Sequence, residues 1–373
     1  MSGGLRVGLL FGGQSVEHEV SVISARGVAA ALRESELTCV PLGVSRDGRW
    51  LSPELSDRIL SGAGPRVEDS PDGDDGMRLL IDPGGRGILR CDSGRALEAI
   101  DVDVLFPLIH GWGGEDGRIQ GALELAGLPC VGAGVLGSAV GMDKAVAKDL
   151  FVTHGLPVAP WLLVTRDAYE DEARAIETRV AEELGFPLFV KPANGGSSVG
   201  ITKVPDPGQL AVALEAALGH DRRAVVEKGL DAREIECAVL GNDRPEASGL
   251  GEIVPSREFY DYAAKYLDGT SELEIPADID PELTREMREQ AVTAFRALDL
   301  AGFARVDFLL DRRTNRPYLN EVNTLPGFTP ISMFPKLWEA AGLPYPRLIE
   351  RLVALALERS RSEATRKTCR EAS

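Results

Sequence analysis

The most informative segment of the chain is Phe303-Ala-Arg-Val-Asp-Phe-Leu-Leu310, followed after a polar turn by Pro317-Tyr-Leu-Asn-Glu-Val-Asn-Thr-Leu-Pro-Gly327. Two apolar runs separated by such a turn predict a β-hairpin. Because side chains alternate along a strand, Arg305 shares a face with Asp307, and Glu321 shares one with Asn323. Two carboxylates and an amide oxygen beside an arginine suit Mg²⁺ carrying a polyphosphate. The hairpin therefore indicates ATP chemistry.

The same pattern also fits a half-exposed hairpin whose polar face meets water. Its apolar residues instead favour a strand that is covered on both faces. These residues are Val306, Phe308, Leu309, Leu310 and Leu319. Carboxylates buried in such a strand need a partner or a metal, so the metal-binding hypothesis is preferred.

Length and charge limit the classes of protein. A chain of 373 residues exceeds one typical domain and predicts two or three. With 58 acidic and 41 basic residues the net charge is -17, which disfavours duplex nucleic acid and an anionic membrane surface as partners. An anionic ligand must therefore meet local basic groups.

Cysteine usage and the N-terminus favour a reducing cytoplasm. The cysteines are odd in number and show neither a C-x-x-C pair nor metal-like spacing. They are Cys39, Cys91, Cys130, Cys237 and Cys369. The first apolar run, residues 7–11, is too short for a signal peptide, and no run approaches about 20 apolar residues. We expect a cytoplasmic protein without a membrane segment.

The first third of the chain predicts an open α/β sheet. Expected strands are residues 5–11, 38–44 and 103–108, and expected helices are residues 17–33 and 119–126. Ligands of such a sheet lie at the carboxyl ends of its strands. Residues 45–98 interrupt the pattern with Gly, Pro and Asp clusters, which predicts an inserted surface region of short hairpins.

Two further units are expected. The second has helices at residues 143–154, 168–184 and 207–218, with strands at 161–164, 188–191 and 201–204. The third begins near Glu227, has a helix at residues 281–298, contains the hairpin and ends in a helix at residues 345–359. A polar tail, residues 360–373, follows and is expected to be mobile.

A lysine at a strand end precedes a loop of small residues in Phe189-Val-Lys-Pro-Ala-Asn-Gly-Gly-Ser-Ser-Val-Gly-Ile201. The glycines would let backbone N–H groups approach phosphate oxygens, Ser197 and Ser198 would add hydroxyl donors, and Lys191 would add charge. A plain hairpin turn fits the loop equally well. The segment 224–235 could offer its backbone to an adenine edge and a carboxylate to a ribose, although a solvated connection explains it better.

Gly132-Ala-Gly134-Val-Leu-Gly137 matches the dinucleotide fingerprint G-x-G-x-x-G. It does not follow a good strand, and no acidic residue stands about 20 positions later in a βαβ unit. We therefore set the dehydrogenase hypothesis aside.

Two loops carry the remaining ionisable groups, Gly12-Gly-Gln-Ser-Val-Glu-His-Glu-Val-Ser21 and His110-Gly-Trp-Gly-Gly-Glu-Asp-Gly117. Acids in the first turn of a helix and a glycine-rich connection are their structural explanations. Both loops nevertheless follow predicted sheet strands, where a carboxylate could hold an ammonium group and a histidine could orient a carboxylate.

In chain order the sequence resembles the D-alanine:D-alanine ligases of the ATP-grasp superfamily. The resemblance spans about residues 5–358. Besides the two loops above, it rests on Met142-Asp-Lys144, Lys191-Pro with Gly196-Ser-Ser-Val-Gly200, Tyr260-Asp-Tyr-Ala-Ala-Lys-Tyr266, Arg305-Val-Asp307 and Asn320-Glu-Val-Asn-Thr-Leu-Pro-Gly327. Region 45–98 resembles the insertion of the longer members.

The resemblance implies an α/β, in part α+β, three-domain ATP-grasp architecture. Its parts would be an N-terminal Rossmann-like substrate domain at residues 1–132, a central ATP-grasp lid domain at 133–227, and a C-terminal domain with the metal site at 228–359. It also implies ATP-dependent ligation of two D-alanines to D-alanyl-D-alanine through an acyl phosphate, for peptidoglycan precursors. The partners would be D-alanine and ATP, without nucleic acid or membrane, in a homodimer.

Site residues follow from the resemblance by position. Two Mg²⁺, with Mn²⁺ as a substitute, would bind Asp307, Glu321 and Asn323. ATP would bind Lys144, Lys191, Ser198, Glu227, Lys228, Leu230 and Glu234. The catalytic set would be Glu17, Ser197, Tyr266, Arg305, His110 and Lys265, in which Glu17 receives the first ammonium, and His110 and Arg305 contact the carboxyl. Gly327 and Ser332 would sit at the second substrate.

A lid is expected over residues 255–274, carrying Lys265 and Tyr266. The competing functions are a D-alanine:D-lactate or D-alanine:D-serine ligase, against which the Lys265-Tyr266 pair argues, and a catalytically silent nucleotide-binding protein. The last would have lost a metal ligand or a lid residue, and none is missing from the sequence.

Overall fold

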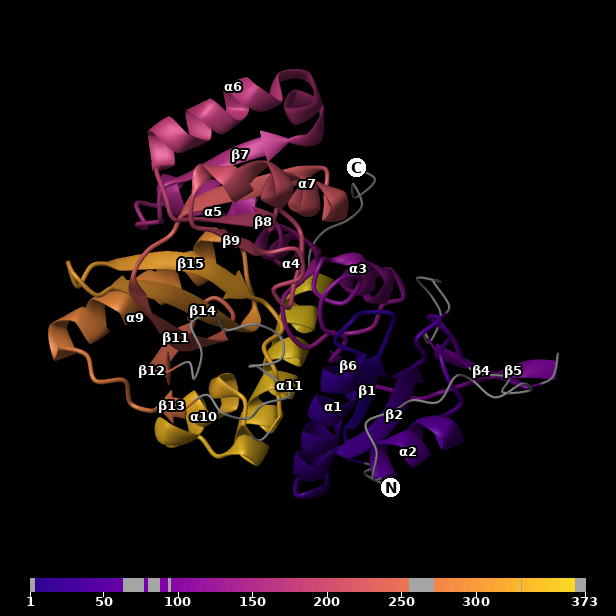
Figure 1. Ribbon diagram of the computed structural model, residues 1–373. Coiled ribbons are helices and arrows are strands. Elements are labelled where there is room, and N and C mark those ends of the chain that lie inside the picture. The colour runs from indigo at the N-terminus through magenta and orange to yellow at the C-terminus, as the bar shows by residue number, and fades with distance from the viewer. Residues whose placement is uncertain are drawn as a thin grey trace, which may run out of the picture.

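The computed structural model describes residues 4–62, 77–79, 88–92, 95–254, 272–329 and 331–365. Within these ranges the strands form four sheets, three of which carry the expected units (Figure 1). No helix in the described part of the chain combines the length and apolar character of a membrane span. Cys39, Cys130 and Cys237 are free thiols.

The N-terminal sheet is parallel, in the order β2-β1-β6. Its strands are β1 (Arg6–Gly12), β2 (Thr38–Val44) and β6 (Val104–Pro107), and its helices are α1 (His18–Arg33), α2 (Pro53–Ser61) and α3 (Arg118–Leu125). A parallel strand covered on both faces is apolar throughout, which explains the run from Val7 to Phe11. Gly12, with φ +93°, then turns the chain toward α1. A Cβ on Gly12 would lie 2.1 Å from the carbonyl oxygen of Val44. The open α/β sheet predicted for the first third is confirmed.

The prediction of hairpins alone for residues 45–98 is partly wrong. A small antiparallel sheet does project there, with strands β3 (Met77–Leu79), β4 (Ile88–Asp92) and β5 (Arg95–Ala99) (Figure 1). Helix α2, however, places Leu55 and Ile59 in the main core. Its start was visible in the sequence, because Ser52 caps the N–H of Leu55 and Pro53 opens the first turn.

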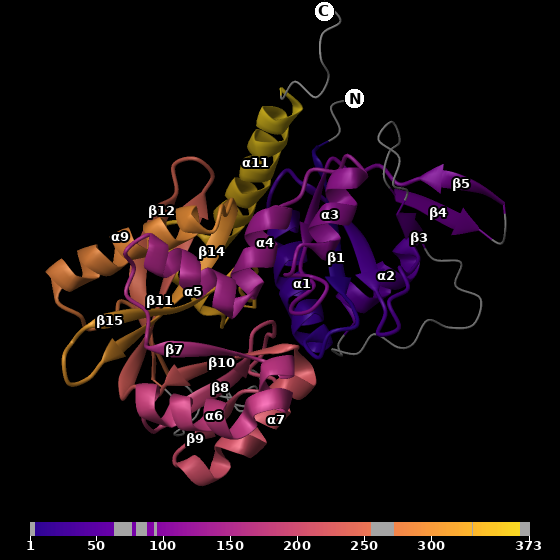
Figure 2. The same ribbon diagram turned by 90° about the horizontal axis from the view of Figure 1, so that it is seen from above.

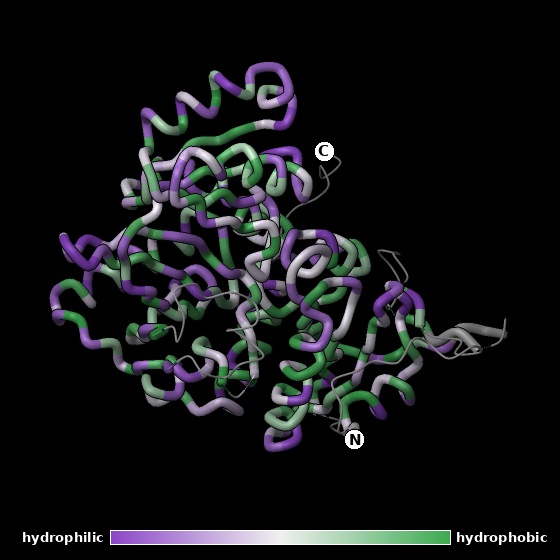
Figure 3. Tube along the Cα trace, in the orientation of Figure 1, coloured by the Kyte–Doolittle hydropathy of each residue, from purple (hydrophilic) through white to green (hydrophobic). Residues whose placement is uncertain are grey.

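The central sheet is antiparallel, in the order β7-β10-β8-β9. It contains β7 (Trp161–Thr165), β8 (Leu188–Pro192), β9 (Thr202–Val204) and β10 (Arg223–Lys228), with α6 (Arg166–Leu184), a 3-10 turn (Pro207–Gln209) and α7 (Leu210–His220). Hydrophobic and hydrophilic residues alternate along α6, so only one side of this outer helix can pack on the sheet (Figure 3). The sheet and its helices form a lobe of their own in Figure 2.

The C-terminal sheet has the order β13-β12-β11-β14-β15. Its strands are β11 (Ala232–Gly241), β12 (Glu246–Val254), β13 (Glu272–Glu274), β14 (Gly302–Asp311) and β15 (Pro317–Asn323). Its surrounding helices are α4 (Val135–Met142), α5 (Lys144–Thr153), α9 (Pro281–Ala297), α10 (Met333–Ala340) and α11 (Tyr345–Ala364). Helix α5 was expected in the second unit, but its Ala147 and Phe151 are buried in the core of this sheet. The hairpin β14-β15 is antiparallel, which confirms the opening prediction. Helix α11 reaches Ala364, so the expected end at residue 359 was too early.

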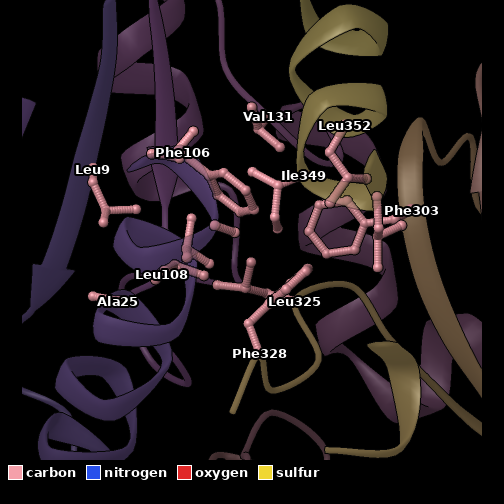
Figure 4. Packing of buried hydrophobic residues seen from close by; sticks show 14 of the residues in the cluster. Leu9, Ala25, Phe106, Leu108, Val131, Phe303, Leu325, Phe328, Ile349 and Leu352 are labelled. Carbon is pink, nitrogen blue, oxygen red and sulfur yellow. The ribbon is translucent and has the colours of Figure 1, made fainter. Parts of the chain in front are cut away.

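One apolar core joins the N-terminal and C-terminal sheets. Phe106 of β6 packs beside Phe303 of β14 and Phe328, while Ile349 and Leu352 of α11 close the cluster (Figure 4). The Phe328 ring stands edge-on to both other rings, with centroids 5.4 Å apart in each pair. The two sheets are therefore held to each other by close packing.

The glycine fingerprint serves packing between elements. Gly132, with φ +98°, lies against the ring of Phe303, and Gly134 precedes helix α4, which the sequence did not reveal. Gly137 lets α4 approach the backbone of Asp299, since a Cβ would lie 2.8 Å from its carbonyl oxygen. This role agrees with setting the dehydrogenase hypothesis aside.

Candidate active site

A cleft of about 410 Å³ opens where the N-terminal, central and C-terminal sheets meet. Many of the predicted site residues line it, although they come from distant parts of the chain. They are Glu17, Lys144, Ser197, Ser198, Arg305, Glu321, Asn323, Gly327 and Ser332. The fold thus brings the predicted metal, phosphate and substrate groups to one place.

The hairpin supplies the oxygen-rich wall of the cleft. Asp307 pairs with Glu321 across β14 and β15, and Arg305 pairs with Asn323. Arg305 donates to both carboxylate oxygens of Asp307 at 2.7 Å. Because the charges compensate each other, the carboxylates can stay ionised beside the apolar core.

The prediction that β14 is covered on both faces is wrong. Burial alternates along the strand, so that Val306, Phe308 and Leu310 are buried while Arg305 and Asp307 are partly exposed on the other face. A strand with one face in the core and one face toward a cleft can hold ionised groups without burying them completely.

Glu236 of β11 was missed by sequence reasoning. It pairs with Asp307 in the sheet, and its carboxylate lies 3.1 Å from Nε of Arg305. Glu236, Asp307 and Glu321 therefore stand in one row across three strands. The signal was the spacing of Glu234 and Glu236, which places them on one face of an expected strand.

The chemistry of the hairpin residues fits a hard divalent cation. Asp307, Glu321 and Asn323 offer only oxygen donors, which Mg²⁺ prefers. In the part of the chain that the structure describes, no group of three or more His, Cys, Asp or Glu residues forms a metal cluster. The proposed set differs from such a cluster because its third ligand is an amide.

Lys144 reaches the cleft from the first turn of α5. The helix begins there because Asp143 accepts a hydrogen bond from the N–H of Val146. Its ammonium donates to the carbonyl of Gly195 at 2.7 Å and lies 4.0 Å from a carboxylate oxygen of Glu321. Burial lowers the pKa of Lys144, although Glu321 opposes this shift. Lys144 thus links the loop of residues 195–200, the glycine–serine loop, to the oxygen-rich wall.

Lys191 is the second-to-last residue of β8 and is buried behind this wall. Its ammonium donates to Glu227 of β10 at 2.7 Å. Burial alone would lower the pKa of Lys191, but the carboxylates of Glu227 and Glu321 outweigh burial and raise it. The carboxylates thus favour the charged form of Lys191.

The glycine–serine loop has a left-handed backbone at Ser197, Ser198 and Gly200, with φ of 52°, 59° and 73°. Non-glycine residues adopt this region at a cost, so the strain is consistent with a functional loop. The hydroxyl of Ser197 is buried and has no hydrogen-bond partner among the residues described. A Cβ on Gly196 would lie 3.6 Å from a carboxylate oxygen of Glu17, so the loop lies against the predicted ammonium site.

His110 lies behind the cleft wall. Its Nδ1 is 3.1 Å from the carbonyl oxygen of Leu325 and 3.5 Å from a carboxylate oxygen of Glu115, which does line the cleft. Burial alone would lower the pKa of His110, but Glu115 and Glu17 outweigh it and raise the pKa. Glu115 is a second site residue that sequence reasoning passed over, although it stands in the glycine-rich loop.

The residues predicted to meet the second substrate lie together after the hairpin. The Ser332 hydroxyl accepts a hydrogen bond from the N–H of Thr329 at 3.1 Å and lies 2.8 Å from the Thr329 hydroxyl. A Cβ on Gly327 would meet Ser332 Oγ at 2.7 Å. A larger residue at position 327 would therefore require the Ser332 hydroxyl to move.

The predicted adenosine residues do not line the cleft itself. Lys228 donates from its ammonium to the carbonyl of Leu184 at the end of α6, at 2.7 Å. Leu230 and Glu234 are partly exposed at the start of the C-terminal unit. Lys265 and Tyr266, with most of the predicted lid, lie outside the residues described.

Comparison with known proteins agrees with this geometry. Two family models match, "D-ala D-ala ligase N-terminus" over residues 6–133 and "D-ala D-ala ligase C-terminus" over residues 150–354. The D-alanine--D-alanine ligase of Acetivibrio thermocellus is 45% identical over 365 residues, which are 95% of this chain and 96% of the relative.

Solved structures agree as well. The D-alanine-D-alanine ligase from Coxiella burnetii has a TM-score of 0.81 and 33% identity, with 97% of each chain covered. The VanG D-Ala:D-Ser ligase from Enterococcus faecalis has a TM-score of 0.82 and 35% identity, covering 95% of this chain and 99% of that one. The fold and the site thus define an ATP-grasp enzyme. More narrowly, the chain belongs to the D-alanine–D-alanine ligase family.

Proposed function

We propose that the protein joins two D-alanines into D-alanyl-D-alanine at the expense of ATP, for peptidoglycan precursors. The observation that carries the proposal is the meeting of Glu17, the glycine–serine loop and the Arg305–Asp307 hairpin in one cleft. Membership in the ligase family over almost the whole chain supports it.

The reaction needs two bond-forming steps. A carboxylate is a poor electrophile, so an oxygen of the first D-alanine carboxylate first takes the γ-phosphoryl group of ATP and ADP leaves. The neutral amine of the second D-alanine then attacks the acyl carbon, and the tetrahedral intermediate expels phosphate to form the peptide bond. Negative charge develops on oxygens in both steps, so fixed positive groups lower both barriers.

Residues of the cleft divide these tasks. Glu17 receives the ammonium of the first D-alanine, with the Ser197 hydroxyl beside it, while Arg305 meets its carboxyl. His110, which lies behind the cleft wall, also helps to hold that carboxyl. The raised pKa of His110 means that its imidazole carries a positive charge more readily. Gly327 and Ser332 hold the second D-alanine, with Ser332 near its carboxylate.

The nucleotide lies on the side of the cleft that the central sheet forms. Lys144, Lys191 and Ser198 meet its phosphates, and Glu227, Lys228, Leu230 and Glu234 surround the adenosine. Asp307, Glu321 and Asn323 hold two Mg²⁺, for which Mn²⁺ can substitute. When bound, the ions neutralise phosphate charge and orient the polyphosphate. The all-oxygen donor set supports this assignment.

Lys265 and Tyr266 belong to a lid over residues 255–274 that closes on the reacting groups. Exclusion of water protects an acyl phosphate from hydrolysis, so a lid is expected of this chemistry. In this proposal Lys265 adds positive charge and Tyr266 joins Ser197 and Glu17.

We further propose three domains at residues 1–132, 133–227 and 228–359, and a homodimer in the cytoplasm. The end of the N-terminal family model at residue 133 supports the first boundary, and the apolar core confined to residues 162–226 supports a separate central unit. Sedimentation of the purified protein tests the homodimer, and cell fractionation tests the location.

The second candidate is a D-alanine:D-serine ligase, favoured by the similarity to the Enterococcus faecalis structure. A D-alanine:D-lactate ligase is an alternative that the same experiment tests. Phosphate release from ATP with a panel of D- and L-amino acids and D-hydroxy acids, together with product separation, decides among them. D-Alanine alone should support turnover, and a product containing D-serine or D-lactate in preference would reverse the assignment.

Glu321→Gln tests the metal site. Loss of one charged ligand should lower turnover at least about a hundredfold without unfolding the protein. Phosphate release at saturating Mg²⁺ and circular dichroism measure the two effects. Near-normal release by the folded variant would remove Glu321 from the metal site.

A further inference from the structure

Lys148 of helix α5 is buried to 1% exposure and has no part in the function proposed above. Its ammonium lies 3.0 Å from Oε1 of Glu227 and donates to the carbonyl of Asn320 at 3.2 Å. Burial lowers the pKa of Lys148, and Glu227 opposes the shift. A lysine in such a place needs its carboxylate partner.

Glu227 stands between two ammonium groups. Its Oε1 faces Lys148, and its Oε2 accepts from Lys191 at 2.7 Å. Lys191 also lies 3.4 Å from the amide oxygen of Asn320, so these four residues form one charge cluster. Burial would raise the pKa of Glu227, but the two lysines outweigh it and lower the pKa to about 2. The carboxylate is therefore ionised at neutral pH.

The charge cluster joins three elements. Lys148 comes from α5, Lys191 and Glu227 from β8 and β10 of the central sheet, and Asn320 from β15 beside Glu321. Few apolar side chains accompany it, because the buried residues between α5 and the central sheet are Ala145, Ala193 and Val225. The cluster thus lies where the central sheet meets the hairpin.

Within the charge cluster two ammonium groups, those of Lys148 and Lys191, face the single carboxylate of Glu227. If Lys191 turns from Glu227 toward a phosphate, Glu227 keeps Lys148 and is not left as an isolated buried charge. Without Lys148, Glu227 would keep the Lys191 ammonium at 2.7 Å and the more distant charge of Lys144. A phosphate would then have to compete with a buried carboxylate for Lys191.

We propose that Lys148 is a positioning residue that neutralises Glu227 and so frees Lys191 to bind nucleotide phosphate. The inference rests on the proposed function, because it takes Lys191 as a phosphate ligand. A merely structural role, in which Lys148 ties α5 to β10 and β15, would instead weaken every ligand of this region alike.

Lys148→Met tests the proposal, since it keeps most of the length of the side chain and removes its charge. The dissociation constants of ADP with Mg²⁺ and of adenosine are measured by titration calorimetry on the full chain. We expect the ADP constant to rise about tenfold and the adenosine constant to change less than about twofold, because adenosine has no phosphate. Lys203→Met, on the exposed part of β9, is the matched control and should alter neither.

Equal weakening of ADP and adenosine, or an unchanged ADP constant, would overturn the proposal. A second comparison covers the case in which Lys148→Met does not fold. In a Glu227→Gln background there is no charge to neutralise, so adding Lys148→Met should change the ADP constant less than about twofold. A tenfold further loss there would show that Lys148 acts independently of Glu227.

The wild-type protein separates the two proposals. If it binds ADP but forms no dipeptide, the proposed function fails and the Lys148 comparison still stands. If it forms dipeptide and Lys148→Met binds ADP as wild type does, only the Lys148 inference fails.

Discussion

The two junctions between the sheets of this protein are built from different materials. The N-terminal and C-terminal sheets share an apolar core, in which Phe106, Phe303 and Phe328 contact one another. The central sheet closes its core with its own residues, all between 162 and 226, and meets the hairpin through the charge cluster. One junction is packed with apolar side chains, and the other pairs buried charges.

This difference has a mechanical consequence. Interdigitated aromatic side chains have few alternative arrangements, so the two outer sheets should behave as one body. Ion pairs and single hydrogen bonds can be exchanged for others as a domain turns. The central sheet is therefore the part expected to move when nucleotide binds. The N-terminal and C-terminal sheets together form the outer frame against which it moves.

The largest effect is expected for Phe303→Ala. Removing a fully buried aromatic ring should cost about 3–5 kcal/mol of the free energy of unfolding. Single-tryptophan variants that retain Trp50, Trp161 or Trp338 report the three sheets during urea unfolding. The Trp50 and Trp338 midpoints should fall together. If only Trp338 responds, the shared core does not couple the outer sheets.

Leu214→Ala makes the opposite test. Leu214 is buried in the central core, and its truncation should cost about 2–5 kcal/mol. The Trp161 midpoint should fall while those of Trp50 and Trp338 stay within error. A common shift of all three probes would mean that the molecule unfolds as one unit and that the charge cluster couples as strongly as the aromatic core.

Acid should loosen the charge cluster before the apolar core. The folded pKa of Glu227 is lowered from 4.5 to about 2, so its stabilising contribution is complete above pH 4.5 and is lost as pH falls toward 2. The Trp161 midpoint should decline in this window more in wild type than in Glu227→Gln, which has no group to protonate. Parallel pH curves for the two proteins would rule out Glu227 as the titrating group.

The smallest effect is expected for Glu17→Gln. This variant tests whether the amino acid is held by the N-terminal and C-terminal sheets while the nucleotide is held by the central sheet. Glu17 belongs to the outer frame and should hold only the amino acid. The KM for the first D-alanine should rise about tenfold, and the KM for ATP should change less than about twofold. Glu34→Gln, exposed at the other end of α1, is the control. Equal rises in both constants would remove Glu17 from the ammonium site.

Local patterns were sufficient for the hairpin and for the type of most elements. The alternation around Asp307 and Glu321 predicted both strands, and the strand end at Lys191 predicted the loop that follows. They failed where tertiary contacts decide. Helix α2 looked like part of a surface insertion because its polar flanks outnumber Leu55 and Ile59, whose burial depends on the neighbouring sheet.

The family, the chemistry of the donor groups and the position of each motif along the chain can all be read from the sequence, because residue types and their spacing are local properties. Only the tertiary structure showed that Glu236 shares Arg305 with Asp307, that Lys148 stands behind Glu227, and that the outer sheets share one core. These facts depend on which strands become neighbours and which side chains lose water together. That is decided when residues far apart in the sequence pack, and no local pattern records it.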